Sequence, residues 1–114
     1  MLVQGMEELE KRFGFVPDFH DDTIESILIA EDRIEMVIQT EDGPSRLQKR
    51  NGARFKLTFL CVKKFSFYGE LPGTVSIILD LLFEKREGWV KTTLETSFGT
   101  GGEIFSEEVK IEML

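Results

Sequence analysis

Alternation of apolar and polar residues dominates the chain from residue 23 to its end. Ile34, Met36 and Ile38, for example, are each separated by one residue. A period of two residues places successive side chains on opposite faces of a β-strand, so each such run predicts a strand with one buried face. The predicted strands cover residues 23–30, 33–40, 55–68, 75–84, 90–98 and 103–114.

Two places in these runs depart from simple alternation. Lys63 and Lys64 interrupt the pattern before Phe65 and Phe67. A bulge or bend there would return both aromatic rings to the core. The run over residues 75–84 is apolar enough to compete as a helix, but its sustained alternation favours a strand.

Turn-forming residues separate the predicted strands. Glu31 and Asp32 form a tight turn within the first hairpin, and glycines at 99, 101 and 102 predict a turn before the last strand. Residues 41–53 contain Gly, Pro and Asn without periodicity, which predicts the longest loop.

The start of the chain has a different pattern. Met6, Leu9 and Phe13 follow helical spacing with charged residues between them, and Gly14 ends the pattern. Residues 3–13 are therefore predicted to form one short amphipathic helix.

The expected fold class is α+β, mostly β, with one N-terminal helix and about six antiparallel strands in a curved meander sheet. The helix could cover the apolar face of the sheet, or the sheet could curve into a half-barrel or sandwich. With 114 residues, the chain predicts a single domain, 1–114, because a second domain would have no core.

Charge and cysteine content narrow the expected environment and partners. The chain has 14 Lys and Arg against 21 Asp and Glu, a formal net charge of −7. This charge argues against nucleic acid or an anionic membrane and is compatible with a basic protein partner. Cys61 is the only cysteine and no long apolar run is present, which predicts a cytoplasmic protein without disulfides. Its position in an alternating run predicts an inert, buried thiol.

The densest polar cluster surrounds the only histidine and consists of Asp18, Phe19, His20, Asp21 and Asp22. An imidazole and three carboxylates could bind a divalent metal or provide a general base. Alternatively, these polar groups could bond to nearby backbone and fix the entry of the chain into the sheet, with Phe19 anchored in the core.

Other catalytic patterns are absent from the sequence. The serines lack the glycines of a nucleophile elbow, the glycine-rich segments lack the lysine of a phosphate loop, and one cysteine excludes a thiolate zinc cluster. We therefore expect a protein that is not an enzyme and that needs no metal or cofactor.

Three further residues are candidates for partner contact. Arg50 lies in a basic segment that also contains Arg46, Lys49, Arg54 and Lys56, which could contact an acidic surface or form a solvated loop. Tyr68 and Trp89 lie at predicted strand ends, where aromatic residues can anchor an interface or cap a core.

The segment Pro17, Phe19, His20 and Asp21, followed by a hairpin, a long loop and a glycine-rich turn, resembles the Imm50-type immunity proteins of bacterial polymorphic toxin systems. This resemblance implies a binding protein that neutralises a cognate toxin, often a nuclease. An acidic β-surface could meet the basic groove of such a toxin, with attraction between the charges raising the association rate.

Two alternatives to a toxin-binding protein stay open. One is a small-ligand or metal-binding domain centred on His20, with hydrolytic activity. The other is a subunit whose exposed sheet edge pairs with a second copy, forming a homodimer.

Overall fold

The computed structural model describes residues 3–5, 7, 22–39, 54–68, 78–96 and 101–114. Its strands are β1 (Val3–Gln4), β2 (Thr23–Ile29), β3 (Arg33–Gln39), β4 (Arg54–Tyr68), β5 (Ile78–Arg86), β6 (Trp89–Thr96) and β7 (Gly101–Met113). The strands predicted from alternation after residue 22 are confirmed where the structure describes them, including the strand reading of β5.

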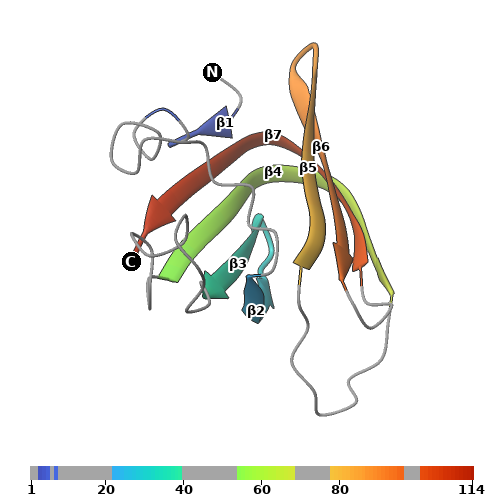
Figure 1. Ribbon diagram of the computed structural model, residues 1–114. Coiled ribbons are helices and arrows are strands. Elements are labelled where there is room, and N and C mark those ends of the chain that lie inside the picture. The colour runs from blue at the N-terminus through green and yellow to red at the C-terminus, as the bar shows by residue number, and fades with distance from the viewer. Residues whose placement is uncertain (1–2, 6, 8–21, 40–53, 69–77, 97–100) are drawn as a thin grey trace.

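The strands form one open sheet in the order β2-β3-β4-β7-β6-β5, and all neighbours in this series are antiparallel (Figure 1). The expected simple meander is wrong, because β7 lies between β4 and β6. Two three-stranded meanders are instead joined through β4 and β7, their longest strands, of 15 and 13 residues. Pairing these two strands satisfies the largest number of backbone groups.

The expected N-terminal helix is wrong, and with it the α+β class. The described residues contain no helical element, and Val3–Gln4 form a strand parallel to β7, with Val3 opposite Val109. Beyond Ser106, the edge of β7 that pairs with β6 becomes free for β1. At Val3 and Gln4, backbone hydrogen bonds to this edge outweigh the helical pattern, and residues 6 and 8–13 of the predicted helix lie outside the described residues. The described fold is therefore all-β.

The two long strands, β4 and β7, lie side by side, and both curve strongly near the middle of their length (Figure 1). Their register shifts between Val62 and Lys64, which is the bulge expected from the interrupted alternation. Cys61, just before it, has a φ of 54°, a left-handed conformation that few non-glycine residues adopt. In orthogonally packed sheets, such bulges form the corners at which strands pass from one layer to the next.

Both halves of the bent sheet bury their side chains in one core. On one side of the bend, the buried residues include Met36, Leu57 and Val109, and on the other they include Leu94 and Ile104. Each large apolar side chain removed from water contributes about 1.5–3 kcal/mol. Within the described residues, this shared core holds the two halves of the open sheet together.

The end strands of the sheet, β2 and β5, come together at one point. The Ile78 amide donates a hydrogen bond to the Asp22 carbonyl over 2.8 Å. Ile78 is fully buried there, and so is Asp22. In the part of the chain that the structure describes, this backbone hydrogen bond connects the two ends of an otherwise open sheet.

The glycines before the last predicted strand have another role than a turn. Gly101 and Gly102 belong to β7, opposite Tyr68 and Phe67 of β4. A Cβ at Gly102 would overlap the Ser66 carbonyl and lie 2.7 Å from the Phe67 ring. Glycine therefore allows β4 and β7 to approach closely at this place.

No stretch of helix in the described parts of the chain has the length and apolar character needed to cross a membrane.

Candidate interaction surface

Of the polar cluster around the only histidine, the structure describes Asp22 alone. Residues 18–21 lie outside the described residues, as does Arg50. Asp22 is buried where β2 meets β5, and its carbonyl accepts the Ile78 hydrogen bond. This bond uses the main chain of Asp22, so the role expected for its carboxylate stays a prediction. Among the described residues, no three His, Cys, Asp or Glu side chains are grouped to hold a metal ion.

A row of alternating cationic and aromatic side chains crosses β4, β7 and β6 beyond the bend. Lys64 lies opposite Phe105, and Phe105 lies opposite Lys91. The Nζ atoms of Lys64 and Lys91 are 4.5 and 6.0 Å from the centroid of the Phe105 ring. Ammonium groups at such distances are attracted to the negative face of an aromatic ring.

Trp89 extends this row at the first residue of β6. Its ring centroid is 5.6 Å from that of Phe105, with the two planes inclined by 40°. Alternation explains the arrangement, because Val90, Thr92 and Leu94 of β6 are buried while Trp89 and Lys91 point to the other face. We call Lys64, Trp89, Lys91 and Phe105 the aromatic–lysine surface.

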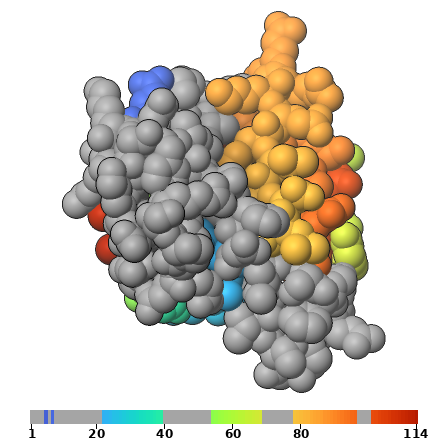
Figure 2. Space-filling view, in the orientation of Figure 1, coloured from blue at the N-terminus to red at the C-terminus, as the bar shows by residue number. Residues whose placement is uncertain are grey.

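Two adjacent depressions lie on this surface. One, of about 280 Å³, is lined by Lys63, Lys64, Trp89 and Phe105. The other, of about 290 Å³, shares Lys64 and Phe105 and extends to Tyr68 and Glu103. The structure thus places Trp89 and Tyr68, two predicted partner-contact residues, on either side of Phe105. In the space-filling view of Figure 2, β5 and β6, in yellow and orange, form a continuous surface that no other part of the chain covers in this view.

The positive charge of this surface is only partly compensated. Lys91 lies 3.8 Å from a carboxylate oxygen of Glu103. For Lys63 and Lys64, no carboxylate among the described residues lies within ion-pair distance. A protein with a net charge of −7 therefore presents two adjacent ammonium groups beside the half-buried rings of Trp89 and Phe105.

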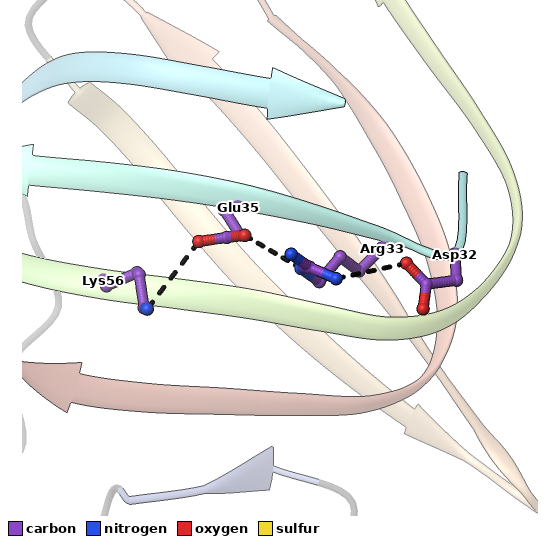
Figure 3. A network of polar contacts seen from close by, with 4 residues as sticks. All are labelled: Asp32, Arg33, Glu35 and Lys56. Carbon is purple, nitrogen blue, oxygen red and sulfur yellow. Dashed lines mark hydrogen bonds and ion pairs between the residues drawn. The ribbon is translucent and has the colours of Figure 1, made fainter. Parts of the chain in front are cut away.

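The polar residues on the other half of the sheet are, in contrast, paired with one another (Figure 3). Arg33 donates a 2.8 Å hydrogen bond from Nε to Glu35 and forms a 3.3 Å ion pair with Asp32. Lys56 lies 3.7 Å from the other Glu35 oxygen. The Arg33 hydrogen bond lowers the pKa of Glu35, and Glu35 in turn raises the pKa of Arg33. This network leaves little uncompensated charge for a partner.

Cys61 is exposed, so the expectation of a buried thiol is wrong. The bulge next to it ends the regular alternation, and the Cys61 side chain turns outward at the bend. A hydrogen bond to Glu107, and the charges of Glu107, Glu108 and Asp32, raise the pKa of the thiol. We therefore still expect the Cys61 thiol to react slowly, but because of its raised pKa and not because it is buried.

Sequence reasoning missed Phe105, Lys64 and Lys91. The signal that could have found them is register: once β7 is placed between β4 and β6, these three residues face one another. In a simple meander β6 would lie next to β7 but β4 would not, so the contact between Lys64 and Phe105 could not be predicted from it.

Comparison with known proteins adds a likeness of fold. No family model matches the sequence, and no curated protein matches it. A solved structure, described as the crystal structure of an uncharacterized protein from Neisseria gonorrhoeae, matches with a TM-score of 0.61 and 12% identity. The match covers 84% of this chain and 94% of the other, so the two proteins share most of their architecture.

Proposed function

We propose that this protein is a non-enzymatic binding protein that docks a partner protein on the aromatic–lysine surface. The observation that carries the proposal is the tilted Trp89–Phe105 pair with Lys64 over the Phe105 ring. Tryptophan and tyrosine are typical of the residues that dominate binding energy at interfaces, and the lysines beside them can pair with carboxylates of a partner.

The charge of this surface identifies the chemistry of the occupant. Lys63 and Lys64 line the depression beside Trp89. Carboxylates of a partner would complement them, with an apolar side chain between the Trp89 and Phe105 rings. The docking segment is therefore acidic and carries an apolar anchor. The sequence, in contrast, led us to expect that an acidic β-surface of this protein meets a basic groove of the partner.

The resemblance of the sequence to Imm50-type immunity proteins supports a toxin as the partner. On this proposal, the partner is a toxin domain, a nuclease for instance, and the protein acts in the cytoplasm, where it protects the cell. Occlusion of the toxin requires no cofactor and no catalytic group in this chain.

The test is co-expression with the protein encoded by the neighbouring gene, followed by calorimetry on the purified pair. Unmodified protein is expected to rescue growth and form a complex. Trp89→Ala and Lys64→Glu are each expected to weaken binding by about tenfold or more. Lys110→Glu, an exposed lysine of β7 on the other half of the sheet, serves as the matched control.

Two results would contradict the proposal. One is the absence of both rescue and complex formation. The other is an equal effect of Lys64→Glu and Lys110→Glu, because overall charge and not this surface would then govern binding.

A further inference from the structure

The second half of β4 has a strand on one side only. On one side, β7 pairs with β4 as far as Tyr68. On the other, β3 pairs with β4 only as far as Leu60, where the chain has reached Arg33 and turns towards β2. In the described part of the protein, residues 62–68 therefore present an unpaired strand edge.

The groups directed to this edge can be assigned from the approach of β7. A Cβ at Gly102 would overlap the carbonyl oxygen of Ser66, so this carbonyl points towards β7. Backbone groups of successive residues point to opposite sides of a strand. The amides and carbonyls of Phe65 and Phe67 therefore point to the open side, where an added strand would find them.

The two faces of this edge differ in chemistry. Lys64 and Tyr68 share the outer face with Phe105, whereas Phe65 and Phe67 share the opposite face with Ile104. The rings of Phe65 and Phe67 pack together at 5.5 Å, yet Phe65 remains 44% exposed. An exposed, apolar strand edge is a template for pairing with another chain.

A depression of about 270 Å³ lies at the end of this edge, in the angle between β4 and the β2–β3 turn. Ala30, Ile34, Val62 and Phe65 line it, together with the charged residues Glu31, Arg33, Lys63 and Lys64. The end of an added strand would enter this depression.

We propose that residues 62–68 accept an extended segment of a partner protein as an additional strand, in which apolar and acidic residues alternate. Its apolar side chains would cover Phe65 and Phe67, and its carboxylates would meet Lys63 and Lys64 on the outer face. Main-chain hydrogen bonds supply affinity in this mode, and the alternate side chains supply specificity. This inference rests on the proposed function and names the form of the docking segment.

Charge favours such a segment over a second copy of this chain. Two paired β4 edges would bring four lysines into one ribbon without added carboxylates, and each copy carries a net charge of −7. A dimer in solution that is lost with changes at Phe65 would therefore overturn the assignment of the partner.

The probe is the acetylated and amidated peptide Val-Glu-Val-Glu-Val-Glu-Val, titrated into the isotope-labelled full chain. Amide signals of residues 62–68 are expected to shift, and exchange at the Phe65 and Phe67 amides to slow by about tenfold or more at saturation. The same peptide with Lys in place of Glu is expected to bind more weakly by about tenfold or more. Shifts confined to β2 or β5, or none at all, would overturn the inference.

Two variants of one residue separate backbone pairing from contact with the ring. Phe65→Ala removes the ring and keeps the amide, whereas Phe65→Pro removes both and leaves the β7 side of the strand intact. Strand addition predicts about tenfold weaker peptide binding for the proline variant than for the alanine variant. Equal binding by two variants whose circular dichroism is native would overturn strand addition, and Phe67→Pro against Phe67→Ala repeats the comparison if one fails to fold.

Failure of this inference and failure of the proposed function give different results. If the edge accepts no strand while Trp89→Ala still abolishes partner binding, only the strand inference falls. If the peptide binds at residues 62–68 while Trp89→Ala leaves partner binding unchanged, the proposed docking surface falls.

Discussion

At the scale of single residues, Cys61 has two features that its neighbours in the sequence do not predict. Its backbone has a φ of 54° and its side chain is exposed beside Glu107. Both follow from its place immediately before the bulge at which β4 turns through the bend.

The backbone conformation of Cys61 predicts an unusual order of stabilities. Left-handed backbone costs roughly 1–2 kcal/mol for a residue with a Cβ, and more for a β-branched one. Cys61→Val is therefore expected to unfold at a lower urea concentration than Cys61→Gly. The difference in the free energy of unfolding is expected to be about 2 kcal/mol. At Ser66, an exposed position of the same strand without positive φ, we expect the reverse order, with valine more stable than glycine. A valine variant at 61 that equals the glycine variant would contradict the assigned strain.

The side chain of Cys61 predicts slow alkylation in spite of exposure. The hydrogen bond to Glu107 stabilises the neutral thiol and raises its pKa, so the thiolate is scarce at neutral pH. The rate of reaction with iodoacetamide is expected to rise with pH up to a pKa above that of a free cysteine. Glu107→Gln is expected to shift this profile to lower pH, and an unshifted profile would show that Glu107 is not the cause.

At the scale of elements, alternation was sufficient to predict most of the strands but not their order. The period of two residues in β3, β6 and β7 follows from burial of one face, which local sequence records. The pairing of β4 with β7 joins residues 33 to 58 positions apart, and no local pattern records it. The aromatic–lysine surface depends on that pairing, so Trp89 and Tyr68 could be predicted as aromatic residues at strand ends but not as neighbours of Phe105.

Local patterns also misled where backbone pairing competed with them. Residues 3–13 carry helical spacing, yet Val3–Gln4 pair with β7. Gly101 and Gly102 have the composition of a turn, yet they lie within a strand because another backbone approaches them. In both cases, a distant strand edge decided the local conformation.

The close approach at Gly102 gives a prediction for the β4–β7 pair. Gly102→Ala would force apart a backbone carbonyl and an aromatic ring, so a loss of about 2–4 kcal/mol of unfolding free energy is expected. Gly88 is the control, because alanine there meets no atom within 4 Å and only its φ of 80° is unfavourable. Gly88→Ala is expected to cost about 1 kcal/mol in urea denaturation. Equal losses would mean that β4 and β7 can separate at Gly102 without cost.

At the scale of the whole molecule, the bend divides the sheet into two halves that share β4, β7 and one core. Among the described residues, one backbone hydrogen bond joins the ends of the sheet, from Ile78 at the start of β5 to Asp22 just before β2. Cohesion between the halves therefore depends mainly on buried side chains and on the two continuous strands.

This arrangement predicts that the halves unfold together, and the single tryptophan provides the means to test it. Trp89 lies in β6, whereas Leu57 is fully buried in the β2–β3–β4 half. Leu57→Ala is expected to cost about 2–5 kcal/mol and to shift the urea transition of Trp89 fluorescence as far as that of far-ultraviolet circular dichroism. Leu82→Ala, an exposed control in β5, is expected to move both transitions little. If Leu57→Ala shifts the circular dichroism transition and leaves the Trp89 transition in place, the two halves are separate cooperative units and the shared core does not couple them.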